Sequence, residues 1–425
     1  MTAFAMKRLV SAVLLVLAAS VHAADGARQF EAAVAADAEC AMGLFMRYRF
    51  DESRETPPPD GYSPFYVSHY GRHGCRYQQN ARQCGAADVL ERVAAVGALT
   101  KKGEALLGRL RRIRDAHVGM WGELAELGAR EHRALARRML GRFPKVFSDG
   151  GRVRCRATTY SRCQMSMANF ACEMKGLAPK LEFDFAAGER SKDVLLHAPD
   201  DSERLSADIE KARGSHFRDM FDPKALVGRL VADSPAAQEA LGDPYEFAES
   251  LFYMAAACRP LSVELAGLET YDAFTLDELV ALGRFMNAKW YMGMGNSAEF
   301  GARTTTAARK LAEDFAARAD EAISRGGIAA DLRFGHDSGL WPFVGLVGLE
   351  GVGDRVPYSE VCEHPALWRD MTMAANVQMA FYRNKTGDVL VKVLYNEKET
   401  PVRGLEPVSG AYYRWSDLKS RLVCK

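Results

Sequence analysis

The tract Arg72-His73-Gly74-Cys75-Arg76 combines residue types that can bind and attack a phosphoryl group. The planar guanidinium of arginine matches phosphate oxygens and stays charged at any working pH. Guanidiniums on both sides of His73 disfavour its imidazolium form, which keeps the ring neutral and nucleophilic. A basic surface turn with an incidental histidine has the same composition, so this tract alone leaves both interpretations open.

A second candidate segment, Gly335-His336-Asp337, could supply a proton donor. A carboxylic acid beside a phosphate site can protonate a departing alkoxide, which is the difficult part of phosphomonoester hydrolysis. The imidazole of His336 can donate to the phosphate, and the N-terminus of the helix that follows favours an anion there. The alternative is that Asp337 merely caps the helix that starts near Leu340.

A third candidate is the tract 153–163, V-R-C-R-A-T-T-Y-S-R-C, which places arginines and hydroxyls near a strand-to-helix junction. Such a junction suits an anion pocket, because the first backbone N–H groups of a helix are free to bind an anion. The tract contains two arginines that could reach a phosphate, Arg156 and Arg162. A charged, exposed turn is the alternative.

Short strands followed by helices must position these tracts. The first tract follows a strand predicted at 65–69, the third begins on a strand at 153–158, and the second ends a strand at 331–335. Two further strands are predicted late in the chain, at 374–382 and 389–395. Helices are predicted at 163–174, at 307–324 with Gly326-Gly327 as the stop signal, at 340–349, and as two or three segments between 100 and 143.

This interleaving of strands and helices predicts an α/β fold, a three-layer sandwich with a mixed central sheet. The segment 176–297 has mostly helical patterns interrupted by prolines. We therefore expect a largely helical inserted domain at 176–297. The α/β domain is expected to comprise a first part at 24–175 and a second part at 298–425.

Residues 1–23 have the pattern of a cleaved signal peptide. Lys7 and Arg8 form a basic start, an uncharged apolar run follows at 9–19, and Val21-His22-Ala23 has small residues where a signal peptidase acts. Cleavage after Ala23 would make the protein periplasmic or secreted. No later stretch approaches about 18 uncharged apolar residues, so we expect no membrane association after cleavage.

Charge excludes one class of partner. Removal of residues 1–23 takes away two basic residues and leaves 54 basic against 55 acidic residues. A protein that binds nucleic acid usually has a basic excess or stripe, so no nucleic-acid partner is expected. A polyanionic substrate would have to be bound by a local basic pocket.

The chain contains nine cysteines. In an exported protein we expect some of them to pair as disulfides, and the odd number leaves at least one thiol over. No C-x-x-C or similarly spaced Cys or His pair is present, so we expect no structural zinc.

Together the three tracts resemble the histidine phosphatase superfamily, in the branch that contains acid phosphatases and phytases. That family opens with R-H-G-x-R-x-P, which the tract 72–76 matches, and closes with H-D, which matches His336-Asp337. Between them the family has an arginine ahead of an S-x-x-F-like helix, matched by Arg162 with Ser166 and Phe170.

A fourth match is the segment Leu99-Thr100-Lys101-Lys102-Gly103, which fits the L-T-x-x-G turn of the family. The chain departs from the family at Tyr77 and Gln78, because the proline that often follows the second arginine is missing. These two positions border the substrate pocket in the family. R-H-G-x-R-Y also occurs in multiple inositol polyphosphate phosphatases, but those typically end in H-A-E rather than H-D, so the substrate stays open.

The resemblance implies a role for each matched residue. His73 would attack phosphorus and become a phosphohistidine, and Asp337 would protonate the leaving oxygen. Arg162 is preferred over Arg156 because of its register with the S-x-x-F-like helix. No cofactor or metal is expected, since arginines supply the positive charge. The residues that would hold the phosphoryl oxygens are Arg72, Arg76, Arg162 and His336.

The function implied by the resemblance is an exported histidine acid phosphatase that hydrolyses small-molecule phosphomonoesters, with inositol polyphosphates such as phytate as candidates. A non-catalytic phosphate- or phytate-binding protein is one alternative. The pair His73 and Asp337 argues against it, because binding alone needs no proton donor. A phosphoryl-transferring mutase of the same fold is another, and the signal peptide and Asp337 argue against that.

Overall fold

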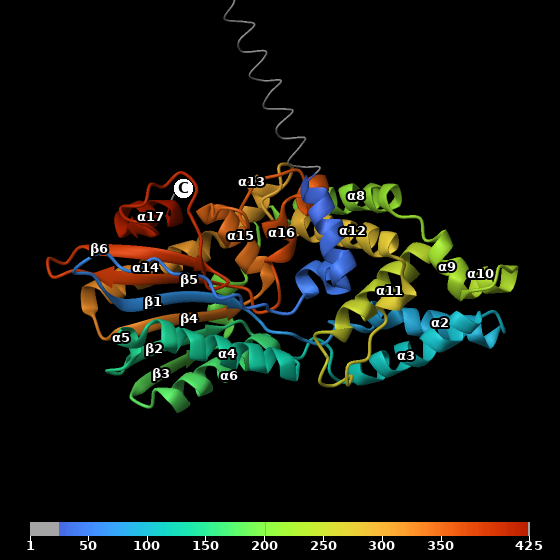
Figure 1. The fold of residues 1–425 in the computed structure, drawn as a ribbon, viewed down its shortest axis with the longest axis horizontal. Coiled ribbons are helices and arrows are strands. Elements are labelled where there is room, and N and C mark those ends of the chain that lie inside the picture. The colour runs from blue at the N-terminus through green and yellow to red at the C-terminus, as the bar shows by residue number, and fades with distance from the viewer. Residues whose placement is uncertain (1–24, 200, 424–425) are drawn as a thin grey trace, which may run out of the picture.

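A mixed β-sheet occupies one half of the molecule and a group of helices occupies the other (Figure 1). The computed structural model describes residues 25–199 and 201–423. The expected signal peptide, residues 1–23, lies outside the described residues, so its cleavage stays a prediction. No helix in the described part of the chain is both long and apolar enough to cross a membrane.

The sheet has the strand order β3-β2-β4-β1-β5-β6-β7, and β8 pairs with β6. Strands β3, β2, β4 and β1 run parallel, whereas β5 is antiparallel to β1 and β6 is antiparallel to β5. The carboxyl ends of β1, β2 and β4 therefore lie at the same edge of the sheet. The strands are β1 Ser63–Arg72, β2 Gly151–Ala157, β3 Leu181–Ala186, β4 Ile328–Gly335, β5 Asn376–Arg383, β6 Val389–Tyr395, β7 Lys398–Glu399 and β8 Tyr412–Arg414.

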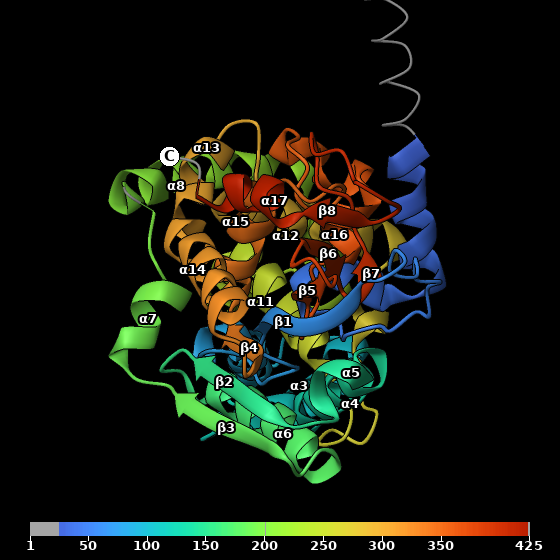
Figure 2. The ribbon, with the colours of Figure 1, turned by 90° about the vertical axis from the view of Figure 1, so that its left-hand side faces the viewer.

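Helices cover both faces of the sheet (Figure 2). On one face, α4 and α6 pack on the sheet, with Phe170 of α6 against Phe334 of β4. On the other face, α14, α15 and α17 pack on the sheet, with Trp415 of α17 edge-on to Phe381 of β5. Strands β1, β4, β5 and β6 are almost wholly buried, as expected for strands covered on both faces. These helices are α4 Glu126–Arg142, α6 Ser161–Leu177, α14 Arg309–Arg325, α15 Asp337–Val347 and α17 Trp415–Leu422.

The second half of the molecule is helical (Figure 1). Helix α11 packs on α2, α3 and α9, and α12 packs on α8 and on the 3-10 segment η1. The helices of this half are α2 Gly85–Ala95, α3 Lys101–His117, α8 Ser202–Met220, α9 Lys224–Leu230, α10 Pro235–Leu241, α11 Pro244–Cys258 and α12 Leu276–Met294, with η1 at Ala38–Phe45.

Short helices connect these elements. They are α5 Pro144–Phe147, α7 Glu189–Leu195, α13 Gly301–Thr304 and α16 Pro365–Arg369, with 3-10 segments η2 Ala81–Cys84, η3 Tyr271–Ala273, η4 Thr305–Ala308 and η5 Tyr358–Glu363.

The predicted fold class is confirmed: a mixed sheet lies between two helical layers, and a helical half adjoins it. One predicted boundary differs from the structure. The segment 176–297, expected to be helical, contains β3, which joins the sheet beside β2. Helices α2 and α3 precede that segment, yet they pack with its helices. The helical half thus draws on two separate stretches of the chain.

The expectation of disulfides is wrong for the described residues. All eight cysteines that the structure describes are free thiols, seven of them buried and Cys172 exposed. They lie on different elements: Cys155 is inside β2, Cys163 is in the first turn of α6 and Cys258 ends α11. A buried cysteine packs as a small apolar side chain, so the seven buried cysteines are explained as residues of the core. The ninth, Cys424, lies outside the described residues.

Candidate active site

The three candidate tracts meet at the carboxyl edge of the parallel strands. Arg72 of β1 lies opposite Gly335 of β4 in the parallel register. The backbone N–H of His73 donates to the Gly335 carbonyl at 2.9 Å, which ties the first tract to the second. The backbone N–H of Thr158, directly after β2, donates to the Phe334 carbonyl at 3.1 Å and adds the third. Parallel pairing of β1, β2 and β4 is therefore what assembles the site.

The turn after His73 fits closely against the start of α4. A Cβ on Gly74 would lie 2.5 Å from the carbonyl oxygen of Gly128, and a Cβ on Gly128 would lie 2.2 Å from the carbonyl oxygen of Cys75. Both positions therefore require glycine because two backbones cross there. Gly103, placed in the family turn by the sequence, instead abuts the Leu230 carbonyl in the helical half. The loop after His73 is thus supported by the start of α4, whereas the segment 99–103 packs within the helical half.

A buried carboxylate also fixes this turn. Glu131 of α4 accepts the backbone N–H of Cys75 at 2.8 Å, its thiol at 3.2 Å and the backbone N–H of Tyr48 at 2.9 Å. On the opposite side, the hydroxyl of Ser166 accepts the backbone N–H of Gly74 at 3.2 Å. The loop around His73 is consequently held by both α4 and α6.

His73 is 1% exposed and has a defined tautomer. Its Nδ1 lies 2.9 Å from the carbonyl oxygen of Gly74, and a carbonyl can only accept, so Nδ1 carries the proton. The free lone pair is then on Nε2. Burial and the nearby guanidiniums of Arg72, Arg162 and Arg76 hold the pKa of His73 well below its ordinary value. The ring is therefore a neutral base with one nitrogen available for attack.

Three buried guanidiniums surround this ring. Arg72, Arg76 and Arg162 are 1%, 5% and 8% exposed. The Nε–H groups of all three have no hydrogen-bond partner among the described residues. Burial, together with Arg162 and Arg72, lowers the pKa of Arg76 to about 9. The group is thus crowded with like charge and short of acceptors.

Different neighbours hold each guanidinium in its orientation. Arg72 donates from one terminal nitrogen to the Leu44 carbonyl at 2.6 Å. Arg76 donates to the Tyr77 carbonyl at 2.7 Å. The guanidinium of Arg162 lies over the ring of Tyr160, 4.7 Å from its centroid, a cation–π contact.

His336 and Asp337 face these arginines from the end of β4. His336 lies edge-on to His73 with 5.6 Å between ring centroids. Its Nδ1 is 3.3 Å from a terminal nitrogen of Arg162, and its Nε2 is 3.2 Å from the Thr158 hydroxyl. Burial and Arg162 lower the pKa of His336 to about 3, so this ring is also neutral.

Asp337 is the first residue of α15 and not its N-cap, which is His336. Its Oδ2 lies 2.7 Å from the second terminal nitrogen of Arg72. Burial raises the pKa of Asp337, but Arg72, His336 and Arg76 outweigh that effect and set the pKa below its ordinary value. The carboxyl group is one-fifth exposed, so solvent reaches it.

The structure separates the two arginines of the third tract. Arg156 pairs with Asp314 of α14, which also binds Arg333 at 2.7 Å. It therefore contributes to an ion-pair cluster on the far side of β2 and β4. Arg162 is the arginine that lies against His336.

Tyr77 and Gln78 are buried, at 7% and 1% exposure. Tyr77 packs edge-on to His117 at 5.4 Å. The amide of Gln78 donates to the Tyr253 carbonyl at 2.6 Å, which links the loop after Arg76 to α11. The contacts of these two side chains thus lie away from His73 and Asp337, toward His117 and α11.

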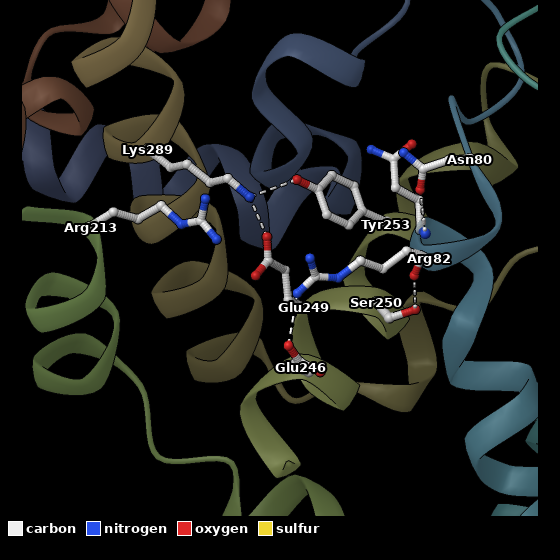
Figure 3. A pocket seen from close by; sticks show the side chains of 9 residues that line it. Asn80, Arg82, Arg213, Glu246, Glu249, Ser250, Tyr253 and Lys289 are labelled. Atoms are coloured by element: carbon white, nitrogen blue, oxygen red, sulfur yellow. Dashed lines mark hydrogen bonds and ion pairs between the residues drawn. The ribbon is translucent and has the colours of Figure 1, made fainter. Parts of the chain in front are cut away.

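A polar pocket lies in the helical half, beside the Tyr253 residue whose carbonyl accepts from Gln78 (Figure 3). Its volume is about 170 Å³, and Tyr253 is one of its walls. Phe45 connects it to the site, since its ring contacts Tyr253 at 5.6 Å and lies 5.6 Å from the Arg76 guanidinium carbon. The pocket is lined by Asn80, Arg82, Gln83, Arg213, Glu246, Glu249, Ser250, Tyr253 and Lys289.

Sequence reasoning missed several residues of this region. Tyr160 lies in the third tract but was given no role there, and Glu131 carries no motif of its own. The cations of the pocket come from three distant segments, so only the fold brings them together. Within residues 25–199 and 201–423, no group of three or more His, Cys, Asp or Glu side chains is arranged to hold a metal ion.

Comparison with known proteins gives a likeness of fold. No protein-family model and no curated sequence matches the chain. The multiple inositol polyphosphate phosphatase of Bifidobacterium longum, solved with inositol hexasulfate, aligns with a TM-score of 0.74 at 19% identity, over 90% of this chain and 97% of that chain. The phytase from D. castellii aligns at 0.64 and 13%, over 91% and 85%. The Klebsiella sp ASR1 phytase aligns at 0.52 and 12%, over 85% and 95%.

The chain has the fold of these phosphatases. The resemblance to the acid phosphatase and phytase branch of the histidine phosphatases, predicted from four short motifs, is confirmed at the level of the fold. At identities of 12–20% the likeness carries no residue roles, so the chemistry has to be argued from the site itself.

Proposed function

We propose that this chain is a phosphomonoester hydrolase that works through a phosphohistidine at His73. The observation that carries the proposal is the charge of the buried site. Arg72, Arg76 and Arg162 have unsatisfied N–H groups, and among the described residues a single carboxylate, Asp337, pairs with this group. Buried cations without enough anions require an anionic ligand, and a phosphate group supplies both the charge and the acceptors.

The reaction runs in two steps. Nε2 of His73 attacks phosphorus, the ester P–O bond breaks, and the departing oxygen takes the proton of the Asp337 carboxyl group. Water then attacks the phosphohistidine, gives a proton back to Asp337, and the N–P bond breaks to release inorganic phosphate. Throughout, the three guanidiniums and His336 bind the phosphoryl oxygens, where negative charge develops. The His336 ring would exchange its contact with Arg162 or Thr158 for one with phosphate.

The proton on Asp337 follows from the ion pair with Arg72. In the free site, Arg72 favours the carboxylate form of Asp337. A bound phosphate draws the Arg72 guanidinium to its own oxygens and adds negative charge beside Asp337. Both changes raise the pKa of Asp337, so substrate binding prepares the carboxyl group as a proton donor.

Removal of the nucleophile tests the activity. We expect the purified protein to release phosphate from p-nitrophenyl phosphate below pH 7, and His73→Ala to release essentially none. A brief reaction with radiolabelled substrate followed by an alkaline quench should leave label on the wild type alone, because phosphohistidine survives alkali. Equal turnover by His73→Ala would refute the mechanism. A wild type that binds phosphate but never turns over would instead be a binding protein.

For the substrate, we propose polyanionic phosphomonoesters, with inositol polyphosphates as the class to test first. Arg82, Arg213 and Lys289 point into the pocket beside Tyr253 (Figure 3), where further phosphate groups of a substrate could bind. A neighbour of the same fold was solved with inositol hexasulfate, a polyanion of this kind. Comparison of kcat/KM for inositol hexakisphosphate, a sugar monophosphate and p-nitrophenyl phosphate tests the choice. Equal values for all three would contradict a polyanion preference.

We also propose that the protein is exported, on the strength of residues 1–23. N-terminal sequencing of the protein from the producing cell should begin at Ala24. A retained Met1 in the mature protein would contradict export by this signal.

A further inference from the structure

One tyrosine hydroxyl is hydrogen-bonded to both the backbone N–H and the backbone carbonyl of His336. The phenol of Tyr70, on β1, donates to the His336 carbonyl at 3.1 Å and accepts the His336 N–H at 3.0 Å. Tyr70 is fully buried. Burial raises the pKa of its phenol, so the O–H keeps its proton at any working pH and remains a donor.

The loop between β4 and α15 is built around this hydroxyl. A Cβ on Gly335 would lie 2.1 Å from the Tyr70 oxygen, and a Cβ on Gly339 would lie 2.3 Å from it. Neither glycine has the positive φ that would by itself explain its presence. The hydroxyl therefore occupies space that two residues leave open, one on each side of His336 and Asp337.

Tyr70 and Arg72 act on the same loop from the same strand. Residues two apart in a strand point to the same face of the sheet, here the face covered by α15. Arg72 holds the Asp337 carboxylate by its side chain at 2.7 Å, and Tyr70 holds the adjoining backbone. In the proposed reaction Arg72 turns toward phosphate when substrate binds. The ion pair then weakens, and the neutral hydroxyl of Tyr70 is the anchor that does not change.

We propose that Tyr70 is the positioning residue for the proton donor: its hydroxyl keeps Asp337 within reach of the leaving oxygen once Arg72 has engaged the phosphate. This inference rests on the proposed phosphatase function. Tyr70 touches no reacting atom, so it affects the chemistry only through the placement of Asp337. Loss of the hydroxyl should therefore impair proton donation more than it impairs attack by His73.

Leaving-group dependence separates these two steps. p-Nitrophenolate delocalises its charge and departs without a proton, whereas an alkoxide such as that from glycerol 2-phosphate needs one. For Tyr70→Phe we expect kcat/KM, which reports the steps up to departure of the leaving group, to fall about tenfold or more on glycerol 2-phosphate and by less than about threefold on p-nitrophenyl phosphate. Asp337→Asn should show the same imbalance with a larger amplitude.

Tyr66→Phe is the matched control. Tyr66 lies four residues earlier on β1, is equally buried, and its hydroxyl donates to Asp331 at 2.8 Å, in a contact that does not involve the His336–Asp337 loop. We expect the ratio of its kcat/KM values on the two substrates to equal that of the wild type, even if its melting temperature falls as much as that of Tyr70→Phe.

The outcomes are distinct. An unchanged kcat/KM on both substrates for Tyr70→Phe, or an equal fall of kcat/KM on both, would overturn the positioning role. The same imbalance in Tyr66→Phe would do so too, because it would make the effect a general one of lost stability. Failure of the proposed function would appear elsewhere, as a wild type inactive on both substrates or a His73→Ala variant that keeps its activity.

Discussion

Cations lie in two groups, one around His73 and one in the polar pocket of the helical half. The two groups differ in how many carboxylates neutralise their charges. The inner group, Arg72, Arg76 and Arg162, is buried and has one carboxylate partner, Asp337. The outer group, in the pocket of the helical half, is matched residue by residue with glutamates. Two of its pairs, Arg82–Glu246 and Lys289–Glu249, are drawn in Figure 3. The third is Arg213–Glu210.

The difference assigns a separate task to each group. The inner cations are buried, so water does not screen their charges from one another or from an anion that enters. Burial, with the charges of Arg162 and Arg72, accordingly lowers the pKa of Arg76. The outer cations already have partners, and the side chain of Arg82 is 81% exposed. Exchange of such an exposed partner for a substrate phosphate costs little and gains little. The inner group should determine turnover, and the outer group should determine substrate preference.

The largest expected effect follows from deletion of one inner cation. Arg162→Met should lower kcat/KM on p-nitrophenyl phosphate by about 10²–10³-fold, the usual cost of losing a preorganised donor to transition-state charge. It should also abolish the rise in melting temperature that inorganic phosphate produces in the wild type, because a ligand that binds only the folded state stabilises it. Steady-state kinetics and thermal unfolding with and without phosphate measure both.

Arg156→Met is the control for that variant. Arg156 stands six residues away, but it pairs with Asp314, which keeps Arg333 as a second partner at 2.7 Å. We expect kcat/KM within about threefold of the wild type. A loss in Arg156→Met as large as in Arg162→Met would mean that the inner group extends beyond the three arginines.

A second prediction concerns buried bases without any acid to pair with. His69 and His132 lie beneath the site on the α6 face, and burial lowers the pKa of each to about 3. The unfolded chain takes up these protons near pH 6.5, while the folded protein does not. The contribution of these two histidines to the free energy of unfolding should therefore fall as the pH drops below 6.5, and this loss should be complete near pH 3.

Substitution of His132 isolates the contribution of this residue to the pH dependence of stability. Between pH 7 and pH 5 each histidine should lower the free energy of unfolding by on the order of 2 kcal/mol. His132→Leu lacks one of these histidines, so its free energy of unfolding should fall by about 2 kcal/mol less than that of the wild type over the same interval. Urea unfolding of wild type and variant at the two pH values gives the difference. Parallel losses in both proteins would indicate that His132 is protonated in the folded state.

The sequence could predict the elements that carry the site because each is locally encoded. The strand predicted at 389–395 is β6 as observed. The strands predicted around 65–69 and 331–335 are β1 and β4, which end directly before His73 and His336. Strand β3 was missed because it was assigned to a long helical segment. Its alternation L-E-F-D-F-A was nevertheless a local signal of a strand.

Contacts between distant segments were beyond local reasoning. Thr100 to Gly103 has the chemistry of a helix start, and its Thr100 does cap α3, but the helix start beside His73 is the one at Gly128. Which of two similar helix starts meets a loop is decided by packing. The choice between Arg156 and Arg162 depended likewise on which side of the sheet each side chain faces, with α14 on one and His336 on the other.

The smallest expected effect comes from the outer group. It bears most directly on the comparison between the inner and the outer cations. Lys289 is held by Glu249 and by the Tyr253 hydroxyl at 2.9 Å, so it lies on the wall nearest the site. Lys289→Met should raise KM for inositol hexakisphosphate by about tenfold, which corresponds to about 1.4 kcal/mol for the loss of one charged contact to a distal phosphate. Its kcat on p-nitrophenyl phosphate, which has no distal phosphate, should not change.

Lys310→Met provides the reference for that measurement, because Lys310 is an exposed cation paired with Asp193 on the sheet half. It removes the same charge from the chain without altering the pocket, so KM for both substrates should stay at the wild-type value. A similar rise in KM for both lysine variants would indicate a general electrostatic attraction of the polyanion. A fall in kcat on p-nitrophenyl phosphate for Lys289→Met would erase the division between the two groups, because an outer cation would then be acting on turnover itself.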